Sequence, residues 1–255
     1  MTVLLRISQA MTLARRIVPE GLGTALLLAV VVGSGIMAER LAGGNVALAL
    51  LANAIATGAG LVALTLMFGT ISGAHFNPVV TLSEAWQKNM PASEVVPYIL
   101  VQVVGAFVGV AAAHLMFGEP LFVASEHIRS GPVQWWSEFV ATFGLLAVII
   151  GCSRSRPAVT PFAVAAYITA AYWFTSSTSF ANPAVTLARS ATNTFAGIRP
   201  IAWLKHYRTC RTSRRPARPA PPGQARPNRR PGPSSPHPDA VRLAARALVQ
   251  PPPDL

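Results

Sequence analysis

Long apolar stretches alternate with short polar ones over the first 200 residues of the chain. Five of these stretches are near 20 residues long and hold few or no charged side chains. They cover residues 19–38, 46–68, 95–117, 135–152 and 159–177. About 20 apolar residues suffice for an α-helix to cross the hydrocarbon core of a bilayer. The pattern predicts an all-α membrane protein with five spanning helices. It predicts no cleavable signal peptide, because the first apolar run leads directly into a segment of membrane length.

The composition agrees with this prediction. Hydrophobic residues make up 52% of the chain and charged residues only 12%, whereas soluble domains hold about a quarter charged residues. The net charge of +12 would favour a nucleic-acid partner if it were spread evenly, but residues 201–255 carry +9 of it. The membrane part is therefore only weakly charged, and we expect no specific nucleic acid to bind the chain.

Residues 201–255 differ sharply from the rest, because they are rich in Arg, Pro and Ala. Repeated prolines forbid a continuous helix, and the few apolar side chains cannot form a core. We predict a membrane domain over residues 1–200, followed by a disordered tail over residues 201–255. The tail is either a basic arm that contacts anionic lipid headgroups or a segment without a selected role, and we favour the second interpretation.

An internal repeat organises the membrane part. Glu20 and Thr24 stand in the first apolar stretch at the same spacing as Glu138 and Thr142 in the fourth. Each pair is followed by a second span and then by an Asn-Pro segment, so the same order occurs twice.

The first repeat, about residues 17–117, adds a third span, whereas the second, about 135–200, lacks one. Three spans per repeat give the two repeats opposite topology, and inverted repeats place a substrate path at their interface. The fold class is therefore an inverted-repeat bundle whose sixth spanning helix is lost. The apolar run expected after residue 200 stops at Lys205. A change of translation frame near residue 201 would explain this, a hypothesis that sequencing the gene there tests.

Each repeat contains an Asn-Pro pair followed by x-Val-Thr-Leu. One such pair is more often an ordinary turn, but two copies at matching places predict two half-helices that meet at the membrane centre. Proline suits the first turn of a helix and asparagine its cap. The asparagine amides remain free to point into a lumen as donors, and the positive helix starts repel cations and protons. The predicted pore residues are Asn77, Pro78, Val79, Asn182, Pro183 and Ala184.

With these motifs, the chain resembles the major intrinsic protein family of aquaporins and aquaglyceroporins. The resemblance covers about residues 17–200, and it is carried by Glu20, Thr24, the segment 72–78, Glu138, Thr142 and the segment 181–184. It implies six spans, two half-helices, a pore through each subunit, a homotetramer and no cofactor. Two departures stand out. Val79 replaces the usual Ala, and the sixth span, on which the pore wall and the tetramer depend, is missing.

The family narrows its pore at four positions outside the paired asparagines. Counted from those asparagines, they fall on Thr57, Ala170, Ser179 and Val185. The family usually has Arg at the last position, so this filter is small and uncharged, without the five donors and positive charge of a guanidinium. Two alternatives stay open: Arg189 or a loop residue fills the gap, or a different loop length shifts the count.

A wide filter favours larger neutral hydroxylated solutes over strict water selectivity. Segments 170–175 and 179–186 also resemble a bacterial subgroup of aquaglyceroporins associated with arsenic-resistance operons. Arsenous acid is uncharged at neutral pH and similar to glycerol in shape. We predict a passive channel for glycerol, arsenous acid and water, placed as a multi-pass protein in a bacterial inner membrane. The alternatives are a non-conducting remnant and a water-selective channel.

Other polar residues point to structural roles. The resemblance implies that the buried carboxylates of Glu20 and Glu138 accept hydrogen bonds from loop N–H groups; a proton relay is the less favoured interpretation. His75 fits a structural or gating contact, and His114 a packed position. No nucleophile–base pair, phosphate loop or zinc spacing is present in the sequence, so we predict no enzyme, no catalytic residue and no metal.

Overall fold

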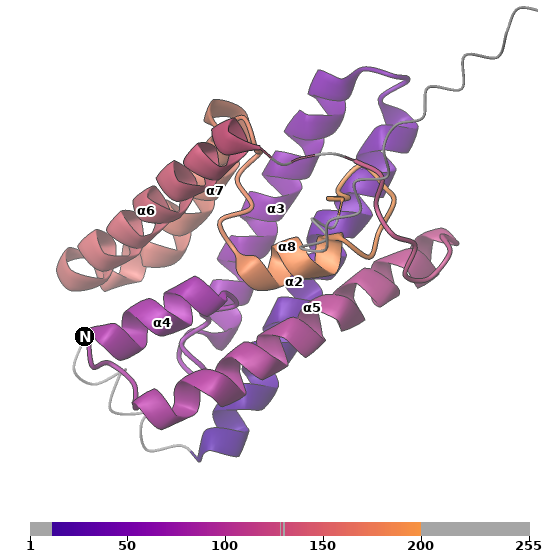
Figure 1. Cartoon of the computed structure of the whole chain (residues 1–255). Helices are drawn as coiled ribbons and strands as arrows, with labels where there is room; N and C mark the ends of the chain where they lie inside the picture. Colours follow the sequence, from indigo (N-terminus) through magenta and orange to yellow (C-terminus); the bar gives the residue numbers. More distant parts are fainter. Residues whose placement is uncertain (1–11, 128, 130, 200–255) are drawn as a thin grey trace, which may run out of the picture. The chain divides into compact units, whose positions relative to one another are not determined.

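The computed structural model describes residues 12–127, 129 and 131–199. This part of the chain contains seven α-helices, two short 3-10 helices and no strand, as the apolar pattern predicts (Figure 1). The α-helices are α2 (Leu13–Leu41), α3 (Val46–Phe68), α4 (Pro78–Trp86), α5 (Val95–Phe117), α6 (Pro132–Ser155), α7 (Thr160–Phe174) and α8 (Pro183–Arg189). The 3-10 helices are η1 (Ala92–Glu94) and η2 (Pro157–Val159).

Four segments of the described part are long and apolar enough to cross a membrane: α2, α3, η1 together with α5, and α6. They cover the first four predicted spans. The fifth prediction, residues 159–177, was too long, because α7 has 15 residues and ends at Phe174. It ends there because Thr175 adopts an extended backbone, with φ −106° and ψ 139°. A helix of this length measures about 22 Å, less than the hydrocarbon core of about 30 Å.

Small residues let α2 pack closely against α5. A Cβ atom added to Gly105 would lie 2.3 Å from the carbonyl oxygen of Gly21, and one added to Gly109 would lie 2.1 Å from that of Ala25. Backbones in contact through glycine and alanine are typical of helix packing in membranes. Both helices contribute to the larger of the two core clusters, which includes Leu28 of α2 and also contains residues of α3 and α8.

The remaining long helices contact one another in the order α2, α3, α7 and α6. Helix α3 contacts both α2 and α7, and α6 contacts α7. Gly58 of α3 lies against Thr169 of α7, and Gly144 of α6 lies under the ring of Tyr167. The second repeat therefore joins the first mainly through the α3–α7 contact.

The two short helices lie among the long ones (Figure 1). Helix α4 contacts α5, α6 and α8, and α8 also contacts α5. The order α2–α3–α4–α5 is followed by α6–α7–α8, which confirms the predicted repeat. No counterpart of α5 follows α8 within the described residues, and the predicted tail, residues 201–255, lies outside them.

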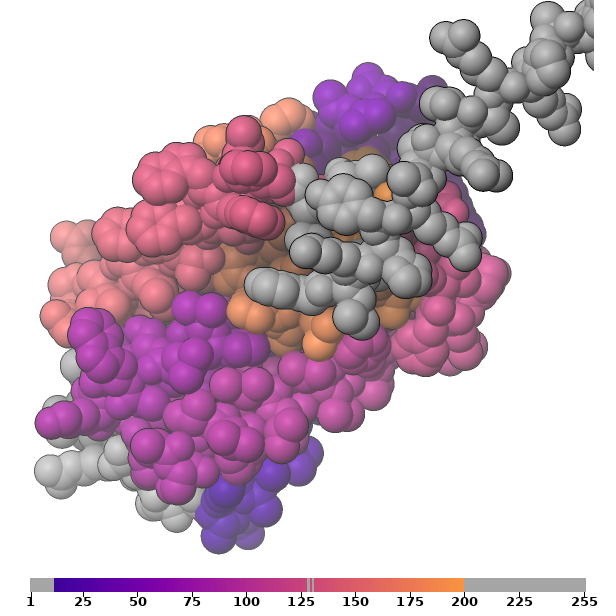
Figure 2. Space-filling view, in the orientation of Figure 1, coloured from indigo at the N-terminus to yellow at the C-terminus, as the bar shows by residue number. Residues whose placement is uncertain are grey.

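Helix α6 is less covered by the rest of the described structure than its counterpart α2. In Figure 2, part of α8 (orange) reaches the surface between α5 (magenta) and α6 (salmon). Among the 18 most apolar consecutive residues of each helix, 56% are buried in α2 but only 11% in α6. Helix α6 therefore presents most of its apolar surface outward, although it occupies the position of α2 in the repeat.

Candidate transport pathway

Each short helix begins at an asparagine that caps it. The Oδ1 atom of Asn77 accepts a hydrogen bond from the backbone N–H of Val79 at 2.9 Å. The Oδ1 atom of Asn182 accepts from the N–H groups of Ala184 and Val185 at 3.1 and 3.3 Å. A proline follows each asparagine at the first helical position. These caps arise from the local sequence alone, as the repeated motif predicts.

The loops before the two helices share an uncommon backbone conformation. Ala74 and Phe76 have φ of 49° and 48°, and Ser179 and Ala181 have φ of 49° and 42°. These residues stand three and one positions before the asparagine of their own repeat. Left-handed φ values are uncommon outside glycine and persist only when the surrounding structure enforces them. The loops before α4 and α8 therefore share the same strained backbone conformation.

Two reciprocal hydrogen bonds join the starts of α4 and α8. The Nδ2 atom of Asn77 donates to the carbonyl oxygen of Ala181 at 2.7 Å. The Nδ2 atom of Asn182 donates to the carbonyl oxygen of Phe76, also at 2.7 Å. The expectation that both amides stay free for a lumen needs correction, because each uses one hydrogen on the opposite loop. An amide has two N–H donors, so one remains on each asparagine.

In each repeat, a buried or partly buried carboxylate accepts hydrogen bonds from the loop that precedes the short helix. Glu20 accepts a hydrogen bond from the backbone N–H of Phe76 and another from Nε2 of Gln102 at 2.8 Å. Glu138 accepts from the backbone N–H groups of residues 180 and 181 at 2.9 and 2.7 Å. Both carboxylates therefore bind loop N–H groups, the arrangement implied by the family resemblance.

One cavity of about 290 Å³ passes both asparagines. Helices α3, α6 and α7 each line it with three or more residues four positions apart, which lie on one face of a helix. These residues are Thr57, Leu61 and Thr65 of α3, Leu145, Ile149 and Ser153 of α6, and Thr160, Val164, Ile168 and Tyr172 of α7. Twelve residues of α7 separate the first from the last, which corresponds to about 18 Å of helix. The cavity is therefore elongated along the bundle.

The ends of the cavity are polar and its middle is mostly apolar. One end carries Thr57, Tyr172 and Arg189, and the other carries Glu84 and Thr160. Glu84 and Arg189 are the charged side chains among the described lining residues. A path with an apolar wall and few polar groups suits small solutes without net charge.

Residues 7–175 match the family model described as "Major intrinsic protein". The chain belongs to the major intrinsic protein family. It is 56% identical over 192 residues to "Aquaglyceroporin AqpS" of Rhizobium meliloti, covering 75% of this chain and 82% of that protein. It is 29% identical over 162 residues to "Aquaporin NIP1-1" of Arabidopsis thaliana, covering 60% of this chain and 54% of that protein. A solved structure of the aquaglyceroporin from Plasmodium falciparum has a TM-score of 0.49 and 21% identity, covering 71% and 78% of the two chains.

Membership of the major intrinsic protein family confirms several predictions. The chain is a multi-pass membrane protein with an aquaporin-like fold, and it is a passive channel rather than an enzyme.

The structure brings three of the four counted filter residues to the cavity. Thr57, Ser179 and Val185 line it, whereas Ala170 does not and lies exposed on α7. Successive residues of an α-helix are about 100° apart, so Ala170 points away from the face of α7 that contains Tyr172. The count of twelve residues back from Asn182 overshoots this face by two positions.

Counting missed Tyr172, which lines the cavity and is only 4% exposed. Its hydroxyl group lies 3.2 Å from Oγ1 of Thr57, within hydrogen-bond distance. The four-residue spacing from Thr160 was the signal that could have identified it. The Oγ atom of Ser179 is buried and has no hydrogen-bond partner among the described residues.

The other motif residues have unequal surroundings. Pro78 and Ala184 are buried, Val79 is half-buried and Pro183 is exposed. Val79 therefore contributes its backbone N–H to the cap of α4 rather than a fully buried side chain.

Two arginines lie near the Tyr172 end of the cavity. Arg129, in the loop before α6, donates to Oγ1 of Thr178 at 2.9 Å and to the carbonyl oxygen of Phe195 at 3.1 Å. Burial lowers the pKa of the Arg129 guanidinium. Arg189 is only 3% exposed and lines the cavity itself, as one of the alternatives left open by the sequence suggests.

Proposed function

We propose that the chain conducts small uncharged hydroxylated solutes, such as glycerol and arsenous acid, together with water, along the cavity between its two repeats. The observation that carries this proposal is the reciprocal pair of hydrogen bonds between Asn77 and Asn182 and the opposite loops, set beside one elongated cavity. Two helix starts held face to face can offer donors at the middle of a path that is otherwise apolar.

Each asparagine has one amide hydrogen left for a passing solute. That hydrogen orients the oxygen atom of water or of a hydroxyl group. The carbon side of a polyol then faces apolar wall residues such as Leu61 and Val164. The N-terminal ends of the two short helices add partial positive charge at the same place, which disfavours cations and protons.

We propose that four side chains that line the cavity select solutes by size: Thr57, Tyr172, Ser179 and Val185. In this proposal Tyr172 takes the position first assigned to Ala170. Val185 offers no donor and little bulk, which favours a solute larger than water. The unpartnered hydroxyl of Ser179 can bind a solute hydroxyl group.

The choice of solutes has two supports. The relative from Rhizobium meliloti is named an aquaglyceroporin, and arsenous acid is neutral at neutral pH and similar to glycerol in its display of hydroxyl groups. We also propose that the protein functions as a homotetramer in the bilayer, as the family resemblance implies.

The test is solute flux in proteoliposomes that contain the full chain. Stopped-flow swelling with glycerol and with arsenous acid, and shrinkage in an impermeant osmolyte for water, should each exceed the rate in empty vesicles. Fast water flux without glycerol flux would favour a water-selective channel. No flux above empty vesicles would favour a non-conducting remnant and overturn the proposal.

A matched pair of substitutions tests the path itself. Thr57→Phe adds bulk inside the cavity, and Ile55→Phe adds the same ring to an exposed position on the same helix, where Ile55 is 56% exposed. We expect Thr57→Phe to lower glycerol flux at least tenfold and Ile55→Phe to leave it within twofold of wild type. Equal fluxes in the two variants would show that the solute does not pass Thr57.

A further inference from the structure

We propose that Arg189 is the residue that excludes cations at the Tyr172 end of the cavity and so determines the charge selectivity of the channel. The inference rests on the proposed function, because it concerns the same path. Position 185, where the family usually has arginine, holds valine in this chain. Arg189 follows Val185 by four residues, about one turn of helix, and is the last residue of α8.

The position of Arg189 allows it to act on the same path as Val185. Residues four positions apart lie on one face of a helix, and both side chains line the cavity. The guanidinium of Arg189 is the charged group at this end among the described lining residues. The carboxylate among those residues, Glu84, belongs to α4 and lies at the Thr160 end.

Two contacts fix the position of the Arg189 side chain. Its Nε atom donates a hydrogen bond to the carbonyl oxygen of Ala196, and its guanidinium lies 5.1 Å from the ring centroid of Phe180. A cation over an aromatic face is stabilised by the ring quadrupole. A cation at the C-terminal end of a helix is also favoured by the helix dipole.

The terminal nitrogens of Arg189 have no hydrogen-bond partner among the residues that the structure describes. Arg189 has no ion pair there either, and Glu138 is bound to the loop N–H groups instead. Arg129 differs, because both of its terminal nitrogens donate to protein atoms. No carboxylate therefore pairs with the positive charge of Arg189 among the described residues, and its field acts on the contents of the cavity.

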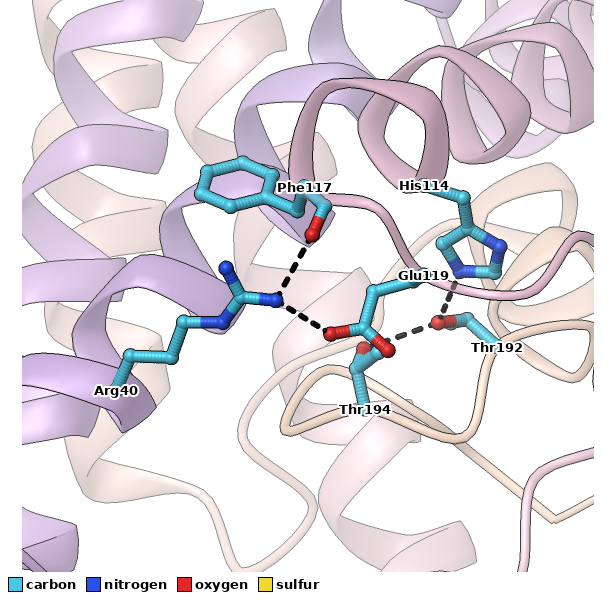
Figure 3. Close-up of polar contacts among 6 residues, drawn as sticks. All are labelled: Arg40, His114, Phe117, Glu119, Thr192 and Thr194. Carbon is cyan, nitrogen blue, oxygen red and sulfur yellow. Dashed lines mark hydrogen bonds and ion pairs between the residues drawn. The ribbon is translucent and has the colours of Figure 1, made fainter.

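Polar contacts between the end of α5 and the loop after α8 support the segment that accepts from Arg189 (Figure 3). His114 Nε2 lies 2.7 Å from Oγ1 of Thr192, which lies 2.9 Å from Oγ1 of Thr194. Gly197 then donates its N–H to the carbonyl oxygen of Thr194 at 2.7 Å. These bonds fix the loop on both sides of Ala196, the acceptor for Arg189.

At the Tyr172 end of the cavity, exclusion of cations and binding of neutral solutes are then carried by different residues. Arg189 repels cations by its charge, whereas the hydroxyl groups of Ser179 and Tyr172 bind neutral solutes. A solute hydroxyl group can donate a hydrogen bond to the unpartnered Oγ atom of Ser179 without any contact with Arg189. Removal of the charge should therefore admit cations more than it slows neutral solutes.

The experiment measures K⁺ efflux and glycerol flux in the same proteoliposomes. We expect Arg189→Gln to raise K⁺ efflux at least fivefold and to keep glycerol flux within about threefold of wild type. Arg189→Lys keeps the charge and should keep K⁺ efflux near the wild-type rate. The double variant Val185→Arg with Arg189→Gln moves the guanidinium by one turn and should restore low K⁺ efflux.

Unchanged K⁺ efflux in Arg189→Gln, with glycerol flux retained, would overturn the inference. Equal K⁺ efflux in the Gln and Lys variants would overturn it as well, because the contacts of the stem and not the charge would then matter. If Arg189→Gln fails to fold, the double variant decides: recovery of glycerol flux with low K⁺ efflux supports the inference, and no recovery contradicts it. Absence of glycerol flux in the wild type would instead contradict the proposed function.

Discussion

The short helices α4 and α8 begin with the same cap but lie in unequal surroundings. Glu20 behind the first loop is fully buried, whereas Glu138 behind the second is partly exposed. Pro78 is buried and its counterpart Pro183 is exposed. The Asn-Pro motif thus determines the start of each helix, and the long helices around it determine how far that start is shielded.

Helix α5 accounts for most of this difference. Its Gln102 donates hydrogen bonds to Glu20 and to Oγ1 of Thr81, and its Tyr98 donates to the carbonyl oxygen of Ser72. In the second repeat, no described helix takes this place. A cavity of about 350 Å³ lies there instead, beside Glu138 and α8.

The two repeats also differ on the face that would contact such a helix. Aligned through their glutamates, Gly21 and Ala25 of α2 correspond to Phe139 and Phe143 of α6. The first pair lets α5 approach the backbone of α2, whereas both phenylalanines are largely exposed. The close packing of the first repeat is therefore not copied in the second.

The largest expected contrast is between the two glutamates. Glu20→Ala would leave the Phe76 N–H and the Gln102 amide as buried unsatisfied donors, which should lower the free energy of unfolding by about 4 kcal/mol. Glu138→Ala should lower it by about 1.5 kcal/mol, because the cavity beside Glu138 has room for water molecules that would accept from the freed N–H groups. Unfolding midpoints in detergent measure both. An equal or greater loss for Glu138→Ala would contradict the idea that shielding separates the repeats.

A second contrast concerns helix packing. A Cβ atom on Gly105 would overlap the backbone of α2, whereas nothing lies within 4 Å of the corresponding atom at Gly151 of α6. Gly105→Ala should lower the free energy of unfolding by about 3 kcal/mol, and Gly151→Ala should raise it slightly, by about 0.5 kcal/mol. Thermal unfolding followed by size exclusion in detergent provides the measurement. If Gly105→Ala were neutral, the α2–α5 contact would be looser than described.

The smallest contrast compares equivalent threonines one turn into each short helix. Both hydroxyl groups donate to the carbonyl oxygen of the capping asparagine, but Oγ1 of Thr81 also accepts from Gln102 and lies 3.1 Å from Nδ1 of His75. Thr81→Val should lower the free energy of unfolding by about 1.5 kcal/mol, and Thr186→Val by about 0.5 kcal/mol. Chemical denaturation of the two variants side by side would resolve the difference. Identical losses would mean that the bonds of Thr81 with Gln102 and His75 contribute nothing measurable.

Much of the fold could be predicted because its signals are periodic or repeated. Apolar stretches of membrane length predicted the ends of four spans to within six residues, and the paired Asn-Pro motifs predicted α4 and α8. The end of α7 could not be predicted, because it depends on how residues 175–181 turn back into the bundle. That turn also decided which residue of α7 faces the cavity, so counting selected Ala170 where the helix presents Tyr172.

The reciprocal asparagine bonds could not be read from the sequence either. Asn77 and Ala181 are 104 residues apart, and nothing in their neighbours indicates which carbonyl oxygen each amide meets. Arg189 was visible in the sequence only as an alternative to Val185. Its burial depends on the ring of Phe180 and on the loop that contains Ala196.

The exchange of hydrogen bonds between the loops has a consequence for biosynthesis. A ribosome that has released only the first repeat into the bilayer leaves the Asn77 amide without the Ala181 oxygen and the Phe76 oxygen without its donor. The left-handed residues of the first loop then keep the bond from the Phe76 N–H to Glu20 but lack their contact with the second repeat. The centre of the channel should therefore reach its final form only after Asn182 has been translated and inserted, however early the surrounding helices have assembled.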